Sequence, residues 1–214
     1  MERDLTIPQS ASQTAPFTQR GLIIGITGGT GCGKTTLLQA IENAGGMVLD
    51  CDAIYHELLK TDASLLAAIE SRFPGTVEDG VLQRKKLGAI VFADEKALLD
   101  LNAITHSAVR KEVQRNLAKM PALAAIDAIA LFEGGLAELC DVTVAVTAPE
   151  EMRIQRLIQR DGISEEYARS RIAAQHSEAW FRERCDCTLE NDGDIDAFAT
   201  KCVAFLRNLG IMKA

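Results

Sequence analysis

The strongest constraint on this chain is an eight-residue segment, Gly28-Gly29-Thr30-Gly31-Cys32-Gly33-Lys34-Thr35, which matches the pattern G-x-x-x-x-G-K-[ST]. An apolar run of strand length, residues 22–27, precedes it, and Leu37, Leu38 and Ile41 follow it at helical spacing. A glycine-rich loop between a strand and a helix directs successive backbone N–H groups, and the positive end of the helix, toward an anion. The segment therefore predicts a loop that binds nucleotide phosphates, and its flanking strand and helix argue against a chance glycine-rich turn.

The loop assigns individual roles to its residues. Lys34 is expected to reach the β- and γ-phosphates as a point charge, and the Thr35 hydroxyl to help hold Mg²⁺. Thr36 adds a second hydroxyl nearby. The residues expected to bind the nucleotide here are Gly29, Thr30, Gly31, Cys32, Gly33, Lys34, Thr35 and Thr36.

Length and composition favour one large α/β domain. The chain has 214 residues, and 47% of them are hydrophobic, which suffices for a sizeable core. Residues 1–20 are rich in Ser, Thr, Gln and Pro and have few apolar side chains to bury, so we expect a flexible tail. The domain is expected to occupy residues 21–214.

Charge and cysteine content narrow the classes of partner. A net charge of −7 and a pI near 5.1 argue against broad binding to nucleic acid or to an anionic membrane, but allow small anionic ligands. The six cysteines include no C-x-x-C pair, and no apolar run resembles a signal core or approaches the ~20 residues that span a bilayer. We therefore expect a cytoplasmic protein with reduced thiols, and the sequence makes no prediction of its oligomeric state.

A second predicted strand, residues 47–50, ends in the acidic segment Asp50-Cys51-Asp52. Ligands of open parallel sheets bind at the carboxyl ends of the strands, so Asp50 and Asp52 should face the phosphates. Asp52 is thus a candidate general base. Aspartate is also a favoured helix N-cap, and the sequence leaves both roles open for Asp52.

Residues 53–120 are predicted to be mostly helical, with turns at 73–75 and 78–80. This stretch is too long for a simple crossover, and by analogy with kinases of small molecules we expect it to form a substrate-binding insertion. Its candidate binding residues are Arg84, His106 and Arg110. A solvated helix face is the alternative explanation for each of them.

A third strand is predicted from Ala124 to Phe132, followed by a loop from Glu133. Asp127, within this strand, and Glu133, at its exit, are both candidates for the carboxylate on the Mg²⁺ side, and the sequence does not choose between them. Two further strands are predicted at 142–146 and 187–190, each followed by a helix.

Residues 153–184 contain seven of the chain's fourteen arginines and no lysine. Arg153, Arg156 and Arg160 follow helical spacing and should share one positive face. Such a row can stabilise a transferring phosphoryl group, and Asp161-Gly162 offers a hinge, so we expect an arginine-rich lid. Pairing of these arginines with Glu150 and Glu151 in the same helix is the alternative.

From about Leu22 to its C-terminus the chain resembles the dephospho-coenzyme A kinases. The matching segments, in the family's order and spacing, are Asp50-Cys51-Asp52, Asp79-Gly80 with Arg84, His106 with Arg110, Leu131-Phe132-Glu133, Arg156 with Arg160-Asp161-Gly162, Arg171 with Gln175, and Asn191. The resemblance implies a P-loop NTPase-type three-layer α/β fold with a parallel sheet of about five strands. It also implies an ATP- and Mg²⁺-dependent phosphotransferase that phosphorylates the ribose 3′-hydroxyl of dephospho-CoA, the last step of coenzyme A biosynthesis.

The same resemblance implies roles for single residues. Asp52 would be the catalytic base, supported by Lys34 and Arg160 in catalysis. Arg156 and Asn191 would contact ATP. The residues implied on the dephospho-CoA side are Asp52, Arg84, His106, Arg110 and Glu133, and those implied on the metal side are Thr35 and Asp127.

Two positions depart from the family pattern, because Ser107 and Ile129 stand where prolines are usual. Without a proline to fix φ, the backbone after His106 has more conformational freedom.

Two other functions compete with that of a dephospho-coenzyme A kinase. A nucleoside monophosphate kinase shares the architecture but should lack the insertion that carries His106. A nucleotide-switch protein of the GTPase type would need an Asn-Lys-x-Asp segment, which the sequence lacks.

Overall fold

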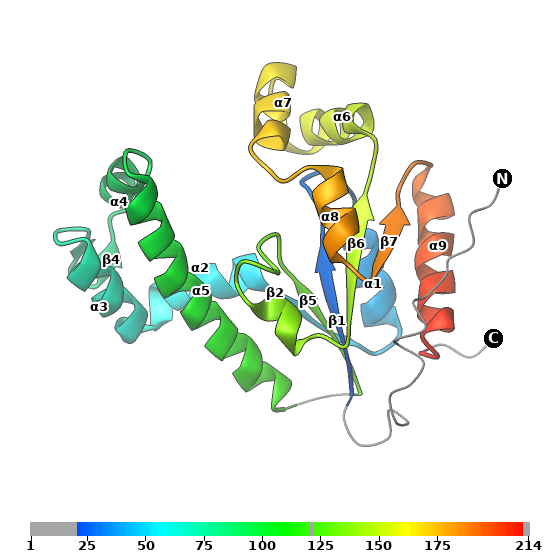
Figure 1. Cartoon of the computed structure of the whole chain (residues 1–214), viewed down its shortest axis with the longest axis horizontal. Helices are drawn as coiled ribbons and strands as arrows, with labels where there is room; N and C mark the ends of the chain where they lie inside the picture. Colours follow the sequence, from blue (N-terminus) through cyan, green and yellow to red (C-terminus); the bar gives the residue numbers. More distant parts are fainter. Residues whose placement is uncertain (1–20, 120–121, 212–214) are drawn as a thin grey trace.

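The computed structural model describes residues 21–119 and 122–211. A five-stranded, fully parallel sheet of order β2-β5-β1-β6-β7 forms its centre (Figure 1). The five parallel strands and the α/β class agree with the sequence prediction. The strands are β1 (Leu22–Thr27), β2 (Met47–Asp50), β5 (Leu123–Asp127), β6 (Val142–Thr147) and β7 (Cys187–Glu190).

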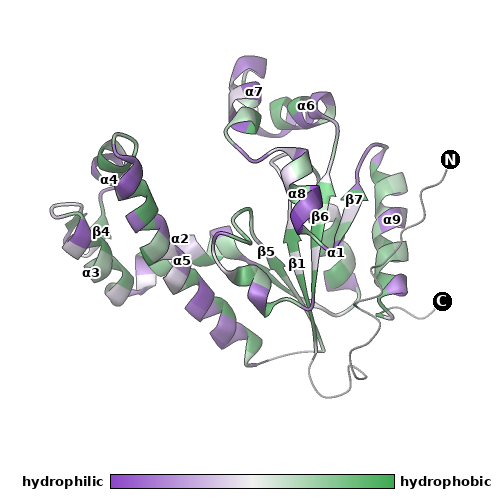
Figure 2. Cartoon of the chain, viewed as in Figure 1, coloured by the Kyte–Doolittle hydropathy of each residue, from purple (hydrophilic) through white to green (hydrophobic). Residues whose placement is uncertain are grey.

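The sheet is covered on both faces, which explains why its central strands are almost continuously apolar. Successive residues of β1 point to opposite sides. Ile24 packs in the cluster that includes α1 (Lys34–Asn43) and α9 (Ile195–Asn208). Ile23 packs in the cluster of the opposite face, which includes Val113. Two cores with the sheet between them give three layers, and Figure 2 shows the hydrophobic residues concentrated around the central strands.

The carboxyl ends of β1, β2 and β5 meet at one edge of the sheet. Asp127, the last residue of β5, pairs in register with Ile26 of β1 and with Asp50 of β2. The glycine-rich loop begins at Gly28, directly after the last residue of β1. Carboxylates and the loop therefore share one edge, as expected for the ligand crevice of an open parallel sheet.

The chain forms a helical subdomain after β2 and before β5, and this subdomain extends to one side of the sheet (Figure 1). The tight turn at Asp79 and Gly80, with φ of 51° and 76°, joins two short antiparallel strands. The sequence predicted this turn but not the hairpin, because two-residue strands carry no periodicity. The elements are α2 (Cys51–Thr61), α3 (Ala63–Arg72), β3 (Val77–Glu78), β4 (Val81–Leu82), α4 (Arg84–Val91) and α5 (Glu95–Leu117).

Three further helices follow β6: α6 (Glu150–Asp161), α7 (Glu165–Ala173) and α8 (Glu178–Arg184). Gly162 ends α6 in the left-handed conformation, with φ of 65°. In Figure 1, α6 and α7 stand beyond the carboxyl ends of the strands. No helix within residues 21–119 and 122–211 has the length and apolar character needed to cross a membrane.

One strand boundary was predicted wrongly. Strand β5 ends at Asp127, and residues 128–135 form turns before the short 3₁₀ helix η2 (Leu136–Leu139). Leu131 and Leu136 are buried in the core beside α5, so these apolar residues pack in irregular structure. Apolar composition alone does not distinguish a buried strand from buried turns. Residues 1–20, expected to be a flexible tail, lie outside the described residues.

Candidate active site

The glycine-rich loop closes around the start of α1. Gly33 caps this helix with φ of 91°, and a Cβ there would lie 2.2 Å from Asn191 Nδ2. Within the described residues no side chain caps this helix, and the Thr36 N–H donates to the Gly33 carbonyl at 3.1 Å, which leaves the N–H groups of Lys34 and Thr35 available to an anion. Lys34 extends back over the loop and donates from Nζ to the Gly28 carbonyl at 3.1 Å.

A cavity of about 610 Å³ opens in front of this loop. Its walls combine backbone N–H groups, cations and two carboxylates, which suits a polyphosphate with a bound cation. The cavity is lined by Gly29 to Thr35, Asp52, Asp127, Ile129, Arg156, Leu157, Gln159, Arg160 and Arg171. The predicted nucleotide residues of the loop, except Thr36, thus share one cavity with Arg156 and Arg160.

Asp127 supplies the carboxylate nearest to Lys34, with Oδ1 3.9 Å from Lys34 Nζ. The pKa of Asp127 is raised to about 6, mainly by burial; Lys34 opposes the rise, and the charges of Asp50 and Asp52 add to it. Among the described residues, Oδ1 is buried and has no hydrogen-bond partner. An orphaned carboxylate oxygen in a cavity that Thr35 also lines fits a hard cation such as Mg²⁺.

Glu133, the other candidate, is directed elsewhere. Its Oε1 lies 2.7 Å from His176 Nε2. It does not line the cavity of the glycine-rich loop. Of these two carboxylates, Asp127 is thus the one that lines the phosphate-side cavity.

Asp52 is free of the capping role that the sequence left open. Helix α2 begins at Cys51, and its N-cap is Asp50, whose Oδ1 accepts from the N–H groups of Asp52 and Ala53 at 2.9 and 3.0 Å. The exposed Asp52 carboxylate makes no hydrogen bond or ion pair with other residues of the described ranges. The N-cap alternative for Asp52 is wrong, because the helix starts two residues earlier than the sequence indicated.

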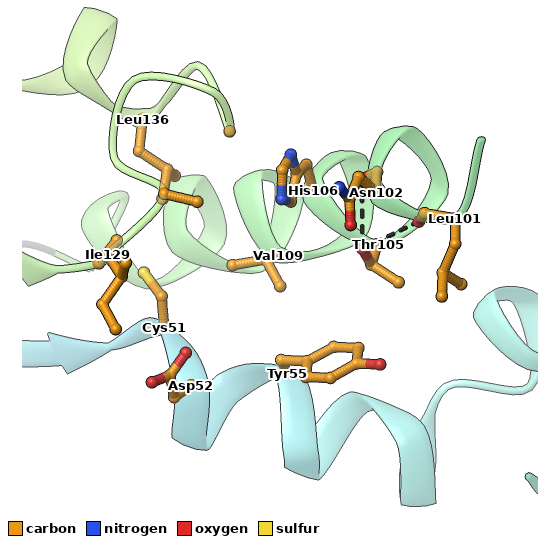
Figure 3. Close-up of a pocket in the computed structure, with 13 residues that line it drawn as sticks. Cys51, Asp52, Tyr55, Leu101, Asn102, Thr105, His106, Val109, Ile129 and Leu136 are labelled. Atoms are coloured by element: carbon orange, nitrogen blue, oxygen red, sulfur yellow. Dashed lines mark hydrogen bonds between the residues drawn. The ribbon is translucent and has the colours of Figure 1, made fainter. Parts of the chain in front are cut away.

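A second cavity, of about 230 Å³, lies between α2, α5 and the turns after β5 (Figure 3). Figure 3 shows Val109 of α5 pointing toward Asp52 and Tyr55 of α2, and His106 on the side of α5 nearer the turns that carry Leu136. Asp52 and Ile129 line this cavity and the phosphate-side cavity alike. The remaining lining residues are Cys51, Leu101, Asn102, Thr105, Ala128, Ala130, Gly134 and Leu136.

Of the basic residues predicted on the acceptor side, only His106 lines this second cavity. Arg110 donates to the Gly135 carbonyl and, at 2.8 Å, to Glu138 Oε2. Arg110 therefore holds Gly135, whose two neighbours Gly134 and Leu136 line the cavity.

Arg84, the first residue of α4, does not line the second cavity but lies beside α2. Its Nη2 lies 3.3 Å from His56 Nδ1. Burial raises the pKa of Tyr55, and the positive charge of Arg84 counteracts the rise. Arg84 is thus an electrostatic neighbour of a cavity residue.

The arginines of α6 divide between two environments. Arg156 and Arg160 line the phosphate-side cavity, but Arg153 is buried and donates from Nε to the Thr30 carbonyl at 2.9 Å. Arg156 Nη1 donates to the next carbonyl, that of Gly31, at 3.3 Å, so Arg153 and Arg156 do face the same loop, but the buried Arg153 does not line the cavity. Their spacing placed them on one helix, but tertiary packing covers Arg153.

The alternative of pairing with Glu150 and Glu151 does not hold for Arg153, Arg156 and Arg160. Glu150 and Glu151 instead pair with Arg169 of α7, at 3.3 and 2.9 Å. Glu150 and Glu151 therefore pair with α7. The two arginines of α6 that line the cavity have other partners, Asn191 for Arg156 and Asp161 for Arg160.

Asp161 holds two of the cavity's cations. Arg160 donates to it through Nε at 2.7 Å and Nη2 at 3.0 Å, and Arg171 Nη1 donates at 2.7 Å. The hydrogen bonds from Arg160 and then Arg171 lower the pKa of Asp161 to about 2. Arg171, which belongs to the predicted lid and to the segments that match the family, lines the cavity from α7 and not from α6.

Asn191 is buried against the loop. It donates from Nδ2 to the Cys32 carbonyl at 2.9 Å and accepts at Oδ1 from Arg156 Nη2 at 3.0 Å. It does not line the phosphate-side cavity. The structure thus gives Asn191 contacts to the loop backbone and to Arg156.

Comparison with known proteins identifies the family. The model of the dephospho-CoA kinase family (CoaE) matches residues 22–197. A dephospho-CoA kinase from Corynebacterium diphtheriae is 36% identical over 180 residues, which are 81% of this chain and 90% of that protein.

Solved structures agree. The protein TT1252 from Thermus thermophilus superposes with a TM-score of 0.75 at 33% identity, covering 89% of this chain and 99% of its own. A dephospho-CoA kinase from Campylobacter jejuni gives a TM-score of 0.63 at 25% identity, covering 89% and 98%. The chain belongs to the dephospho-CoA kinase family.

Proposed function

We propose that the protein transfers the γ-phosphoryl group of ATP to the ribose 3′-hydroxyl of dephospho-CoA and releases coenzyme A and ADP. One observation carries the proposal beyond family membership: the two cavities meet at Asp52, which lines both. A bisubstrate transfer needs one place where a phosphoryl donor and an acceptor hydroxyl approach each other. Asp52 is the carboxylate at that place.

The phosphate-side cavity is proposed to hold ATP. The N–H groups of the loop and the first turn of α1 would surround the phosphate oxygens, and Lys34 would contact the β- and γ-phosphates. Arg156, Arg160 and Arg171 line the same cavity and can offset charge as the phosphoryl group moves. Asn191 would act through the Cys32 carbonyl and Arg156.

Thr35 and Asp127 would hold Mg²⁺. When bound, the metal supplies charge neutralisation at the phosphate oxygens. The buried Oδ1 of Asp127 supports this role, because it accepts no hydrogen bond from the described residues and its ion-pair neighbour, Lys34 Nζ, is 3.9 Å away; a buried carboxylate oxygen without a donor costs free energy unless a ligand satisfies it.

The second cavity is proposed to hold the acceptor next to Asp52. Tyr55 and Val109 offer apolar surface, and His106 offers polar contacts (Figure 3). Arg84 and Arg110 stand around this cavity and supply positive charge for an anionic acceptor. Glu133, predicted as an acceptor contact, would act indirectly through His176.

Asp52 is proposed to take the proton of the acceptor hydroxyl as the oxygen attacks the γ-phosphorus. Its carboxylate is exposed to the junction and is not used by the helix cap, so both oxygens are available. General-base assistance of this kind typically contributes about 10²–10⁴-fold to the rate.

An ADP-release assay with a panel of acceptors tests the proposal. The purified chain is given ATP and Mg²⁺ with dephospho-CoA, AMP, CMP, UMP or no acceptor. ADP release is expected with dephospho-CoA, together with a product that carries a 3′-phosphate. Release with AMP, CMP or UMP in place of dephospho-CoA would indicate a nucleoside monophosphate kinase, and release independent of any acceptor would indicate a hydrolytic switch.

A further inference from the structure

Two adjacent residues between α7 and α8 reach different parts of the active site. We call residues 174–177 the α7–α8 linker. Gln175 Oε1 accepts hydrogen bonds from the Thr30 N–H at 2.8 Å and from Arg153 Nη2 at 3.2 Å. His176 Nε2 lies 2.7 Å from Glu133 Oε1. One side chain thus contacts the glycine-rich loop, and the next contacts the turns that follow β5.

On the nucleotide side, the contacts fix the peptide groups around Thr30. Gln175 binds the N–H of Thr30, and Arg153, which is 8% exposed, binds its carbonyl through Nε. A Cβ at Gly29 would lie 2.3 Å from Arg153 Nη2 and 3.1 Å from Gln175 Oε1. The two side chains are therefore packed directly onto the loop backbone and leave it little room to shift.

On the acceptor side, aromatic contacts extend the pairing with Glu133. The His176 ring stacks on Trp180 of α8 at 3.8 Å with an interplanar angle of 5°. Trp180 packs edge-on against Phe132 with ring centroids 5.7 Å apart. Gly134, directly after Glu133, lines the acceptor-side cavity. The linker and α8 therefore support the wall of that cavity.

The linker also follows α7 directly. Helix α7 ends at Ala173, and Arg171 in its last turn lines the phosphate-side cavity. Fixing Gln175 and His176 limits where Arg171 can lie.

We propose that Gln175 and His176 are positioning residues for phosphoryl transfer: the α7–α8 linker holds the glycine-rich loop and the turns after β5 at the separation that brings donor and acceptor together at Asp52. The inference rests on the proposed function. Gln175 acts on the nucleotide side and His176 on the acceptor side.

Substitutions that remove one contact at a time test the proposal. Gln175→Met keeps the side-chain length but loses the acceptor oxygen, and Gln175→Glu keeps an acceptor. His176→Phe keeps a ring that can stack on Trp180 but loses the contact with Glu133. Gln39→Met is the matched control, because Gln39 is exposed on α1 and, among the residues that the structure describes, hydrogen-bonds only within that helix. The readouts are the Kd of a fluorescent ATP analogue, the KM for dephospho-CoA, kcat and the thermal midpoint.

The two substitutions are expected to affect different substrates, Gln175→Met the nucleotide and His176→Phe dephospho-CoA. Gln175→Met should weaken nucleotide binding about tenfold, as loss of a hydrogen bond to a partly buried N–H typically does, and leave the KM for dephospho-CoA nearly unchanged. Gln175→Glu should restore most of the affinity. His176→Phe should raise the KM for dephospho-CoA and leave the nucleotide Kd unchanged. Both Gln175→Met and His176→Phe should lower kcat, and their combined loss should be smaller than the product of the single losses.

Other outcomes overturn the proposal. A lowered thermal midpoint with unchanged Kd, KM and kcat would make the linker a structural element only. Independent, multiplicative losses in kcat would show two local contacts without a shared spacing role. Nucleotide binding is measured without an acceptor, so a wild-type protein that does not phosphorylate dephospho-CoA would contradict the proposed function and still allow the nucleotide half to be tested.

Discussion

The buried carboxylate of Asp127 predicts an unusual dependence of stability on pH. Its folded-state pKa of about 6 lies above the ordinary value of 3.8, mainly because burial disfavours the charged form. The folded protein therefore binds a proton on Asp127 more tightly than the unfolded chain does. The stabilisation that this proton provides is fully present below pH 3.8 and is lost as the pH rises through about 6.

The size of the effect follows from the two pKa values. Each pKa unit corresponds to about 1.4 kcal/mol, so a rise from 3.8 to about 6 amounts to about 3 kcal/mol. In Asp127→Asn the side chain stays neutral at every pH, while Lys34 keeps its charge. The free energy of unfolding of the wild type, relative to that of Asp127→Asn, should therefore fall by about 2.4 kcal/mol between about pH 4 and pH 7, because a small part of the full change already occurs below pH 4, and it should remain nearly constant above pH 7.

Urea unfolding of both proteins without nucleotide or metal, at several pH values between about 4 and 8, measures this difference. Asp79→Asn is the control, because it removes a carboxylate from an exposed turn whose positive φ asparagine tolerates. The reasoning is refuted if the wild type and Asp127→Asn differ by the same free energy at both ends of the range. A wild type that gains relative stability as the pH rises would refute it as well.

The same protonation should compete with the metal. If Asp127 holds Mg²⁺, the Mg²⁺ concentration for half-maximal activity should rise as the pH falls through about 6, since the ligand must be deprotonated. Asp127→Asn should combine greater stability at neutral pH with a strongly weakened Mg²⁺ response.

Three substitutions test the other proposed roles. Asp52→Asn should lower kcat by about 10²–10⁴-fold and leave the KM for dephospho-CoA and the thermal midpoint close to wild type, because Asp50 supplies the helix cap; a fully active variant would contradict the base role. Lys34→Ala should abolish most transfer in a folded protein, checked by circular dichroism beside the activity assay, and normal turnover would refute the phosphate contact. Arg160→Lys keeps the charge but loses the planar fork, and should lower kcat roughly tenfold; an unchanged kcat would exclude bidentate phosphate recognition at this position.

The sequence by itself determined the features that depend on local spacing. The glycine-rich loop is recognisable because glycines, Lys34 and Thr35 must follow each other at fixed intervals for backbone N–H groups to converge on phosphate. The five parallel strands are recognisable because burial on both faces requires short apolar runs. The order and spacing of further motifs then indicated the family.

Tertiary structure decided which side chains share an environment. The sequence could not separate Asp127 from Glu133, because apolar residues after Asp127 pack equally well in turns, and the end of β5 sets which carboxylate reaches Lys34. It could not decide whether Asp50 or Asp52 caps the helix, since a helix start two residues earlier moves the cap to Asp50.

The contacts of the α7–α8 linker were likewise beyond local patterns. Gln175 meets Thr30 across 145 positions of sequence, and His176 meets Glu133 across 43. Helical spacing likewise placed Arg153 beside Arg156, but only the packing of α6 on the loop buries Arg153 and leaves Arg156 at the cavity. Periodicity describes neighbours along one element, whereas these contacts depend on how separate elements pack against one sheet edge.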